Sequence, residues 1–110
     1  MDNPQLNFRS ARREDTGLIL KFIKALAEYE KMAGEVVATE ELLEEWIFDK
    51  GKAEVLFVEE NGTPVGFALF FHNFSTFLGR AGIYLEDLFV LPEYRGKGYG
   101  KALFKKLAAT

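Results

Sequence analysis

Two groups of residues with chemical potential lie close together near the end of the 110-residue chain. Glu86 and Asp87 are adjacent carboxylates inside an apolar run, and residues 95–101 read Arg-Gly-Lys-Gly-Tyr-Gly-Lys. Glycines in such a turn permit positive φ angles and let backbone N–H groups approach an anion closely. A helix that begins there would add its unpaired amides and the positive end of its dipole. The pattern therefore predicts a phosphate-binding turn.

Spacing argues against two familiar nucleotide-binding motifs in this turn. A P-loop needs Gly-x-x-x-x-Gly-Lys-Ser/Thr, and Lys101 is followed by Ala102, which lacks the hydroxyl group that would bind Mg²⁺. The order Gly-x-Gly-x-Gly also differs from the Gly-x-Gly-x-x-Gly fingerprint of dinucleotide-binding folds. Another class of phosphate ligand is therefore expected.

Apolar periodicity predicts two helices ahead of this region. Apolar residues recur at helical spacing over 13–32, where Asp15 or Thr16 can cap the helix start. A second helix is expected over 38–51, with Thr39 as its N-cap. Its buried stripe is expected to consist of Leu42, Leu43, Trp46 and Ile47.

Strands are predicted at 6–11, 53–60, 64–74 and 83–91. Asn61-Gly62 between the second and third is a strong hairpin signal. Pro92 ends the last strand, and the glycine-rich turn opens a helix over 100–109. The predicted order β-α-α-β-β-β-α indicates one mixed α/β domain over residues 1–110 and not a doubly wound βαβ array.

Composition limits the partners. The net charge of −3 combines an acidic first half, with 11 acids and 7 bases over residues 1–50, and a basic cluster in the second. An anionic ligand near the turn and a cationic one near the acidic half would suit this distribution, whereas nucleic acid would not. No long apolar run or signal peptide is present and cysteine is absent, so we expect a cytoplasmic protein without disulfides that does not insert into membranes. With His72 as the single histidine, no metal site is expected.

The sequence Arg95-Gly96-Lys97-Gly98-Tyr99-Gly100 matches the signature Arg/Gln-x-x-Gly-x-Gly/Ala, in the order strand, turn, helix. It resembles the pyrophosphate-binding signature of the GCN5-related N-acetyltransferase (GNAT) superfamily. "YLEDLFVLPEYRGKGYG", and more loosely "FIKALAEYEKM" and "PVGFALFF", are similar to the diamine group, the spermidine/spermine and thialysine N-acetyltransferases. The resemblance covers the first two thirds of such a domain. We therefore expect a C-terminally incomplete domain that lacks the final β-α-β-β portion and its general-acid tyrosine.

The resemblance implies transfer of an acetyl group from acetyl-coenzyme A to a primary amine of a small diamine, polyamine or lysine-like acceptor. The residues that it implies for coenzyme binding are Leu88, Phe89, Val90, Arg95, Gly96, Lys97, Gly98, Tyr99, Gly100 and Lys101.

For the acceptor, the resemblance implies that Glu86 acts as the base and that Tyr29, Glu30 and Asp87 contact the amine. Because side chains alternate along a strand, Glu86 and Asp87 are expected to point to opposite faces. Ser75 stands where the polyamine enzymes carry an acid, which favours a shorter amine or a lysine analogue.

The family resemblance also implies a homodimer. Two alternatives stay open at the level of the sequence. The chain could be a non-catalytic module that binds coenzyme A weakly, or not at all, and oligomerises through an unpaired strand edge. It could also be an interaction domain that binds basic peptides on its acceptor face.

Overall fold

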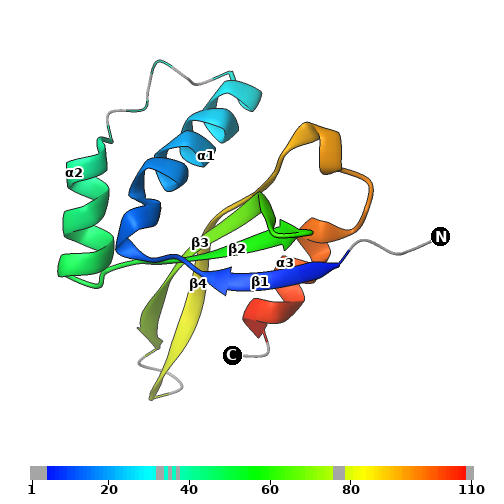
Figure 1. Ribbon diagram of the computed structural model, residues 1–110. Helices are drawn as coiled ribbons and strands as arrows, with labels where there is room; N and C mark the ends of the chain where they lie inside the picture. The colour runs from blue at the N-terminus through cyan, green and yellow to red at the C-terminus, as the bar shows by residue number, and fades with distance from the viewer. Residues whose placement is uncertain (1–4, 32–33, 35, 37, 76–78, 109–110) are drawn as a thin grey trace.

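The computed structural model describes residues 5–31, 34, 36, 38–75 and 79–108 of the protein (Figure 1). Its elements are β1 (Leu6–Ser10), η1 (Arg13–Asp15), α1 (Thr16–Tyr29), α2 (Glu40–Leu43), η3 (Glu44–Asp49), β2 (Glu54–Glu60), β3 (Thr63–Ser75), β4 (Arg80–Val90), η4 (Pro92–Tyr94) and α3 (Tyr99–Ala108). The order of strands and helices confirms the predicted mixed α/β class.

The four strands form one sheet in the order β1-β2-β3-β4, and each neighbouring pair is antiparallel. Asn61 and Gly62 join β2 to β3 with φ angles of 52° and 85°. These are the positive angles that a tight hairpin turn requires, so the predicted hairpin is confirmed. β4 lies at one edge of the sheet, and the chain passes from it through η4 into the glycine-rich turn.

The sheet separates two apolar clusters because successive strand residues point to opposite faces. On one face, Ile19 and Phe22 of α1 pack with Phe57 and Phe67 of the strands. On the other face, the core is formed by Val58, Val65, Ala68, Phe70, Val90, Tyr99, Leu103 and Leu107. Figure 1 shows α1 and α2 on one side of the sheet and α3 on the other. Within the described part of the chain, no helix is both long and apolar enough to span a bilayer.

The two predicted helix starts differ in outcome. Thr39 caps α2 as expected, since its hydroxyl accepts the Leu42 N–H at 3.2 Å. Asp15 precedes α1, but its side chain makes no capping hydrogen bond to that helix. Its carboxylate instead accepts the Arg12 N–H at 2.7 Å and pairs with Arg9. Asp15 therefore ties η1 to the first strand.

The predicted second helix changes geometry halfway. After the single α-helical turn of α2, η3 continues as a π-helix, whose wider turns rotate the following side chains away from an α-helical stripe. Ile47 is buried and Leu43 packs partly against the core. Leu42 and Trp46 remain 43% and 46% exposed, so the predicted buried stripe is wrong at these two positions.

Candidate active site

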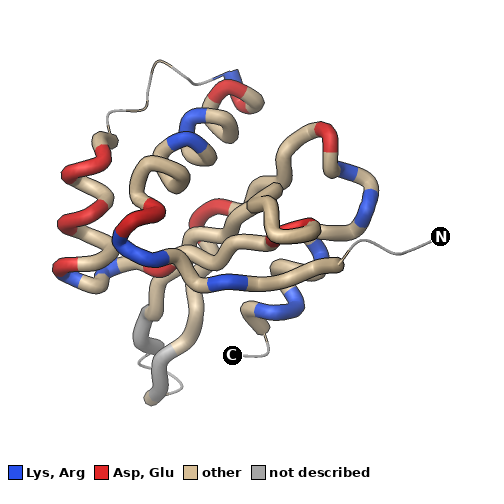
Figure 2. The backbone as a smooth tube through the Cα atoms, in the orientation of Figure 1, with Lys and Arg blue, Asp and Glu red and all other residues tan. Residues whose placement is uncertain are grey.

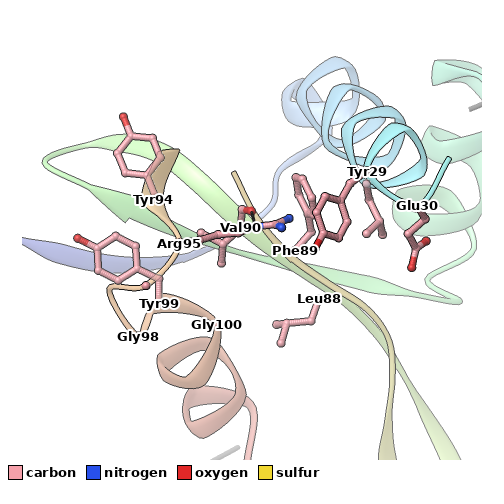
Figure 3. Close-up of a pocket in the computed structure, with 12 residues that line it drawn as sticks. Tyr29, Glu30, Leu88, Phe89, Val90, Tyr94, Arg95, Gly98, Tyr99 and Gly100 are labelled. Carbon is pink, nitrogen blue, oxygen red and sulfur yellow. Dashed lines mark hydrogen bonds between the residues drawn. The ribbon is translucent and has the colours of Figure 1, made fainter. Parts of the chain in front are cut away.

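A pocket of about 440 Å³ opens where the end of α1, the end of β4 and the glycine-rich turn meet (Figure 3). It is lined by Leu26, Tyr29, Glu30, Leu88, Phe89, Val90, Tyr94, Arg95, Gly96, Gly98, Tyr99 and Gly100. The structure thus brings most of the predicted coenzyme residues together with two of the predicted acceptor residues. Sequence reasoning missed Leu26 and Tyr94. The spacing of Leu26 from Tyr29, one helical turn, was a signal that could have identified it.

The turn has the backbone geometry of an anion site. Gly96 and Gly98 have φ angles of 83° and 80°, and nothing lies within 4 Å of a Cβ atom at either position. In α3, the Ala102 N–H bonds to the Gly98 carbonyl at 3.0 Å. The amides at the very start of α3 precede this first helical bond, so they have no carbonyl partner within the helix. The turn can therefore direct backbone N–H groups at a bound phosphate.

Arg95 connects the turn to the other two walls of the pocket. Its Nε–H donates to the Val90 carbonyl at 2.9 Å. Its guanidinium lies 3.9 Å from the centre of the Tyr29 ring and 5.1 Å from that of Phe89. Figure 3 shows this side chain extending from the turn toward α1. The aromatic faces of Tyr29 and Phe89 thus already hold a cation.

Glu86 and Asp87 do not line the pocket, and the strand is irregular at this point. Leu69 of β3 pairs with Asp87 and Phe70 pairs with Leu85, which leaves Glu86 as an extra, bulged residue. In consequence Leu85 and Leu88, three residues apart, both pack against the α3-side cluster. Regular alternation of side chains does not hold across Glu86. The argument that Glu86 and Asp87 point to opposite faces of the sheet therefore does not apply here, and their relative orientation stays a prediction.

Asp87 nevertheless belongs to a group of interacting carboxylates. Partial burial raises the pKa of Asp87, and the negative charges of Glu86 and Glu30 raise it further. Glu30 comes from the end of α1 and the other two from β4. The fold therefore gathers the three carboxylates that the sequence analysis assigned to the acceptor side.

The lysines of the turn lie outside the pocket lining. The Lys97 ammonium contacts Glu60 Oε1 at 3.3 Å, and Lys101 is exposed. Figure 2 shows positive charges along the turn and α3, and a run of negative ones along α2 and η3. Ser75 ends β3, but its side chain lies outside the described residues. Among the side chains that the structure describes, no three His, Asp or Glu residues are grouped to hold a metal ion.

Comparison with protein families gives a match over most of the chain. Residues 20–110 match the model of the Acetyltransferase (GNAT) family.

Curated relatives point to the same group. The chain is 41% identical to thialysine N-epsilon-acetyltransferase of Bos taurus and 43% identical to that of Sus scrofa, each over 91% of its own length. It spans 64% of the length of these two relatives.

Solved structures share the fold. A ribosomal-protein-alanine N-acetyltransferase from Brucella melitensis biovar Abortus 2308 superimposes with a TM-score of 0.77 at 23% identity, over 96% of this chain and 70% of that chain. At this level of identity the likeness concerns the fold alone. The predicted GNAT-like fold class is confirmed by this likeness and by the family match.

Proposed function

Because the chain belongs to the GNAT acetyltransferase family, we propose that it forms the coenzyme-binding part of an N-acetyltransferase that acetylates a primary amine of a small, lysine-like or diamine acceptor. The observation that carries this proposal is the pocket that joins the glycine-rich turn, the end of β4 and the end of α1. Acetyl-coenzyme A would supply an activated thioester as the acetyl donor.

The residues of the pocket fit such a donor. The open glycine turn offers backbone amides to the pyrophosphate, and the Arg95 guanidinium, held against Tyr29 and Phe89, adds a positive charge to the pocket. Leu88, Phe89 and Val90 lie at the end of the edge strand β4, where backbone groups can pair with an extended ligand. Backbone N–H groups placed there would also stabilise negative charge on the thioester oxygen during attack.

The carboxylates at the end of α1 and on β4 suit an acceptor whose ammonium group must lose a proton before it can attack. An amine with a pKa of about 10 is neutral in roughly one molecule per thousand at pH 7, so attack requires a proton acceptor. We propose Glu86 for this role, and Asp87, Glu30 and Tyr29 as contacts of the ammonium group. The raised pKa of Asp87 supports this assignment, because the repulsion among carboxylates that contributes to it would be relieved by a bound cation. Tyr29 already holds the Arg95 guanidinium against its ring.

Two observations favour a lysine-like amine over a polyamine: Ser75 replaces an expected acid, and the relatives named above are thialysine enzymes. A homodimer and a cytoplasmic location stay predictions of the sequence. Because the chain spans 64% of those relatives, a fragment that binds coenzyme A without turnover is the competing proposal. A third proposal is an interaction domain that binds basic peptides on its acceptor face, independently of coenzyme A.

Calorimetric titration of acetyl-coenzyme A into the parent chain, Gly98→Asp and Gly51→Asp tests the coenzyme site. Gly98 and Gly51 both have positive φ, and at both positions a Cβ atom would meet no other atom within 4 Å. The two substitutions therefore introduce the same charge and comparable backbone strain, but only Gly98 lies in the pocket. We expect Gly98→Asp to weaken binding at least about tenfold, equivalent to about 1.4 kcal/mol, and Gly51→Asp to leave it unchanged.

Equal loss of affinity in both variants, or no binding by the parent, would overturn the assignment of the site. Measurement of acetyl transfer to lysine analogues and diamines then separates the enzyme from the coenzyme-binding fragment. Turnover by the chain supports the enzyme, and binding without turnover supports the fragment.

A further inference from the structure

Glu60 is a nearly buried carboxylate in contact with the glycine-rich turn. It is the last residue of β2 and its side chain is 12% exposed. Its Oε1 atom accepts a hydrogen bond from the Tyr99 hydroxyl at 3.0 Å and another from the Lys97 ammonium at 3.3 Å. A single oxygen atom from the β2–β3 hairpin thus holds two side chains of a turn almost forty positions later in the chain.

The turn needs such anchors because its own backbone is permissive. Gly96 and Gly98 carry no side chain to pack, and the space around them is open. Tyr99 is different, since the residue is only 5% exposed within the α3-side cluster and its hydroxyl donates to Glu60. A tyrosine hydroxyl is a hydrogen-bond donor at neutral pH, and burial and the Glu60 carboxylate raise the pKa of Tyr99 further. Core packing and this hydrogen bond together orient the residue at which α3 begins.

The charges at this point also require an explanation. A carboxylate beside a phosphate site would repel the ligand unless its charge were offset. Lys97 and Tyr99 both donate to the same oxygen, which offsets that charge and holds the ammonium at the turn. Lys97 is 45% exposed, and exposed ion pairs contribute little to stability. The contact is therefore better suited to offsetting the charge of Glu60 than to stabilising the fold.

We propose that Glu60 is a positioning residue of the coenzyme site, which holds Tyr99 and with it the amides at the start of α3 toward the pyrophosphate, while Lys97 offsets the charge of Glu60. The inference rests on the proposed function and adds to it a residue from outside the signature. Glu60 does not line the pocket and acts through Tyr99.

The test compares Glu60→Ala and Glu60→Gln with the matched control Glu54→Ala. Glu54 is an exposed carboxylate on the same strand, paired with His72 and away from the turn. Affinity for acetyl-coenzyme A is measured by calorimetry at a temperature where circular dichroism shows every variant folded. Amide hydrogen exchange of Gly96, Gly98 and Gly100 is measured without ligand.

We expect Glu60→Ala to weaken binding about tenfold and to accelerate exchange in the turn. Glu60→Gln should lose less affinity, because its amide oxygen can still accept the Tyr99 hydrogen bond, and Glu54→Ala should match the parent. A purely structural role would lower the unfolding temperature and leave the affinity of the folded protein unchanged.

Failure of this inference is distinct from failure of the proposed function. If the parent binds acetyl-coenzyme A and Glu60→Ala binds it as tightly or more tightly, the role of Glu60 is overturned and the proposed function stands. If the parent does not bind, both are overturned.

Discussion

The side chain of Arg95, a residue of the signature, contacts both β4 and α1. Its guanidinium donates to the carbonyl of Val90 on β4 and lies against the ring of Tyr29 on α1. A planar guanidinium combines a directed hydrogen bond with stacking on a ring, whereas a lysine ammonium offers a point charge. Arg95 therefore joins the proposed coenzyme and acceptor sides of the pocket, which the signature alone does not indicate.

At the same scale, Asp87 gives a prediction about titration. Removing a neighbouring negative charge favours the ionised form of Asp87, so its pKa should fall in Glu86→Gln and in Glu30→Gln, and more in the former because the Glu86 charge has the larger effect. Carboxyl carbon NMR as a function of pH measures this value directly. Glu28→Gln serves as the control on α1, since Glu28 does not contribute to the shift. A pKa of Asp87 that stays constant in all three variants would contradict the interaction among these carboxylates.

At the scale of the element, β4 and the turn after it depart from regular structure at two successive points. The bulge at Glu86 changes which residues of β4 face α3, and the glycines then reverse the chain into that helix. Both departures lie next to the pocket. Bulges are common beside active sites because they redirect side chains without ending the strand.

Alanine substitutions at two glycines of the turn should differ in their effect on stability, because only one of the two glycines has a positive φ angle. Gly98 has positive φ, so Gly98→Ala should cost about 1 kcal/mol or more of the free energy of unfolding. At Gly100, a Cβ atom would meet Val90 Cγ2 at 3.8 Å, an ordinary contact, and the position is helical. Gly100→Ala should therefore keep or gain stability, by up to about 1 kcal/mol. Urea denaturation of both variants measures the difference, and equal destabilisation would refute the distinction.

At the scale of the whole molecule, a charged cluster fastens the first strand to the rest of the fold. Arg9 of β1 pairs with Asp15 of η1 at 2.7 Å and with Glu59 of β2 at 2.9 Å. Its guanidinium also lies 5.1 Å from the centre of the Phe57 ring. Glu59 is 7% exposed, so its charge depends on this partner. The pairing holds the pKa of Asp15 and of Glu59 below their usual values and raises that of Arg9.

This cluster predicts an acid-sensitive fold. Because the two carboxyl pKa values are lower in the folded than in the unfolded chain, their stabilisation is present above about pH 4 and is lost as the pH falls through the folded values. Arg9→Met should lower the free energy of unfolding by about 3 kcal/mol at pH 7, and by less at pH 3.

Urea denaturation at pH 7 and pH 3 measures the loss of unfolding free energy in Arg9→Met, with Arg12→Met as the control. Arg12 forms an exposed pair with Glu14 at 3.5 Å, so its loss should change the free energy of unfolding by less than about 1 kcal/mol. An equal effect of Arg9→Met at both pH values would show that the paired carboxylates do not carry the pH dependence.

Features that depend on local spacing could be predicted from the amino-acid sequence. The order of strands and helices, the Asn61-Gly62 hairpin and the Thr39 cap each follow from residues within a few positions of one another. The signature of residues 95–100 indicated the family for the same reason, because its glycines and the following helix form one continuous segment.

Features that depend on pairing between distant segments emerged only in the folded chain. The bulge at Glu86 and the contact of Glu60 with Tyr99 arise where two distant segments meet, and no local pattern encodes them. The π-helical geometry of η3 was likewise not predicted by the apolar spacing. The bulge depends on how β4 pairs with β3, and a shift of one residue exchanges the faces of all side chains beyond it. Local spacing therefore located the groups that can carry out the chemistry, and long-range pairing decided which of them face one another.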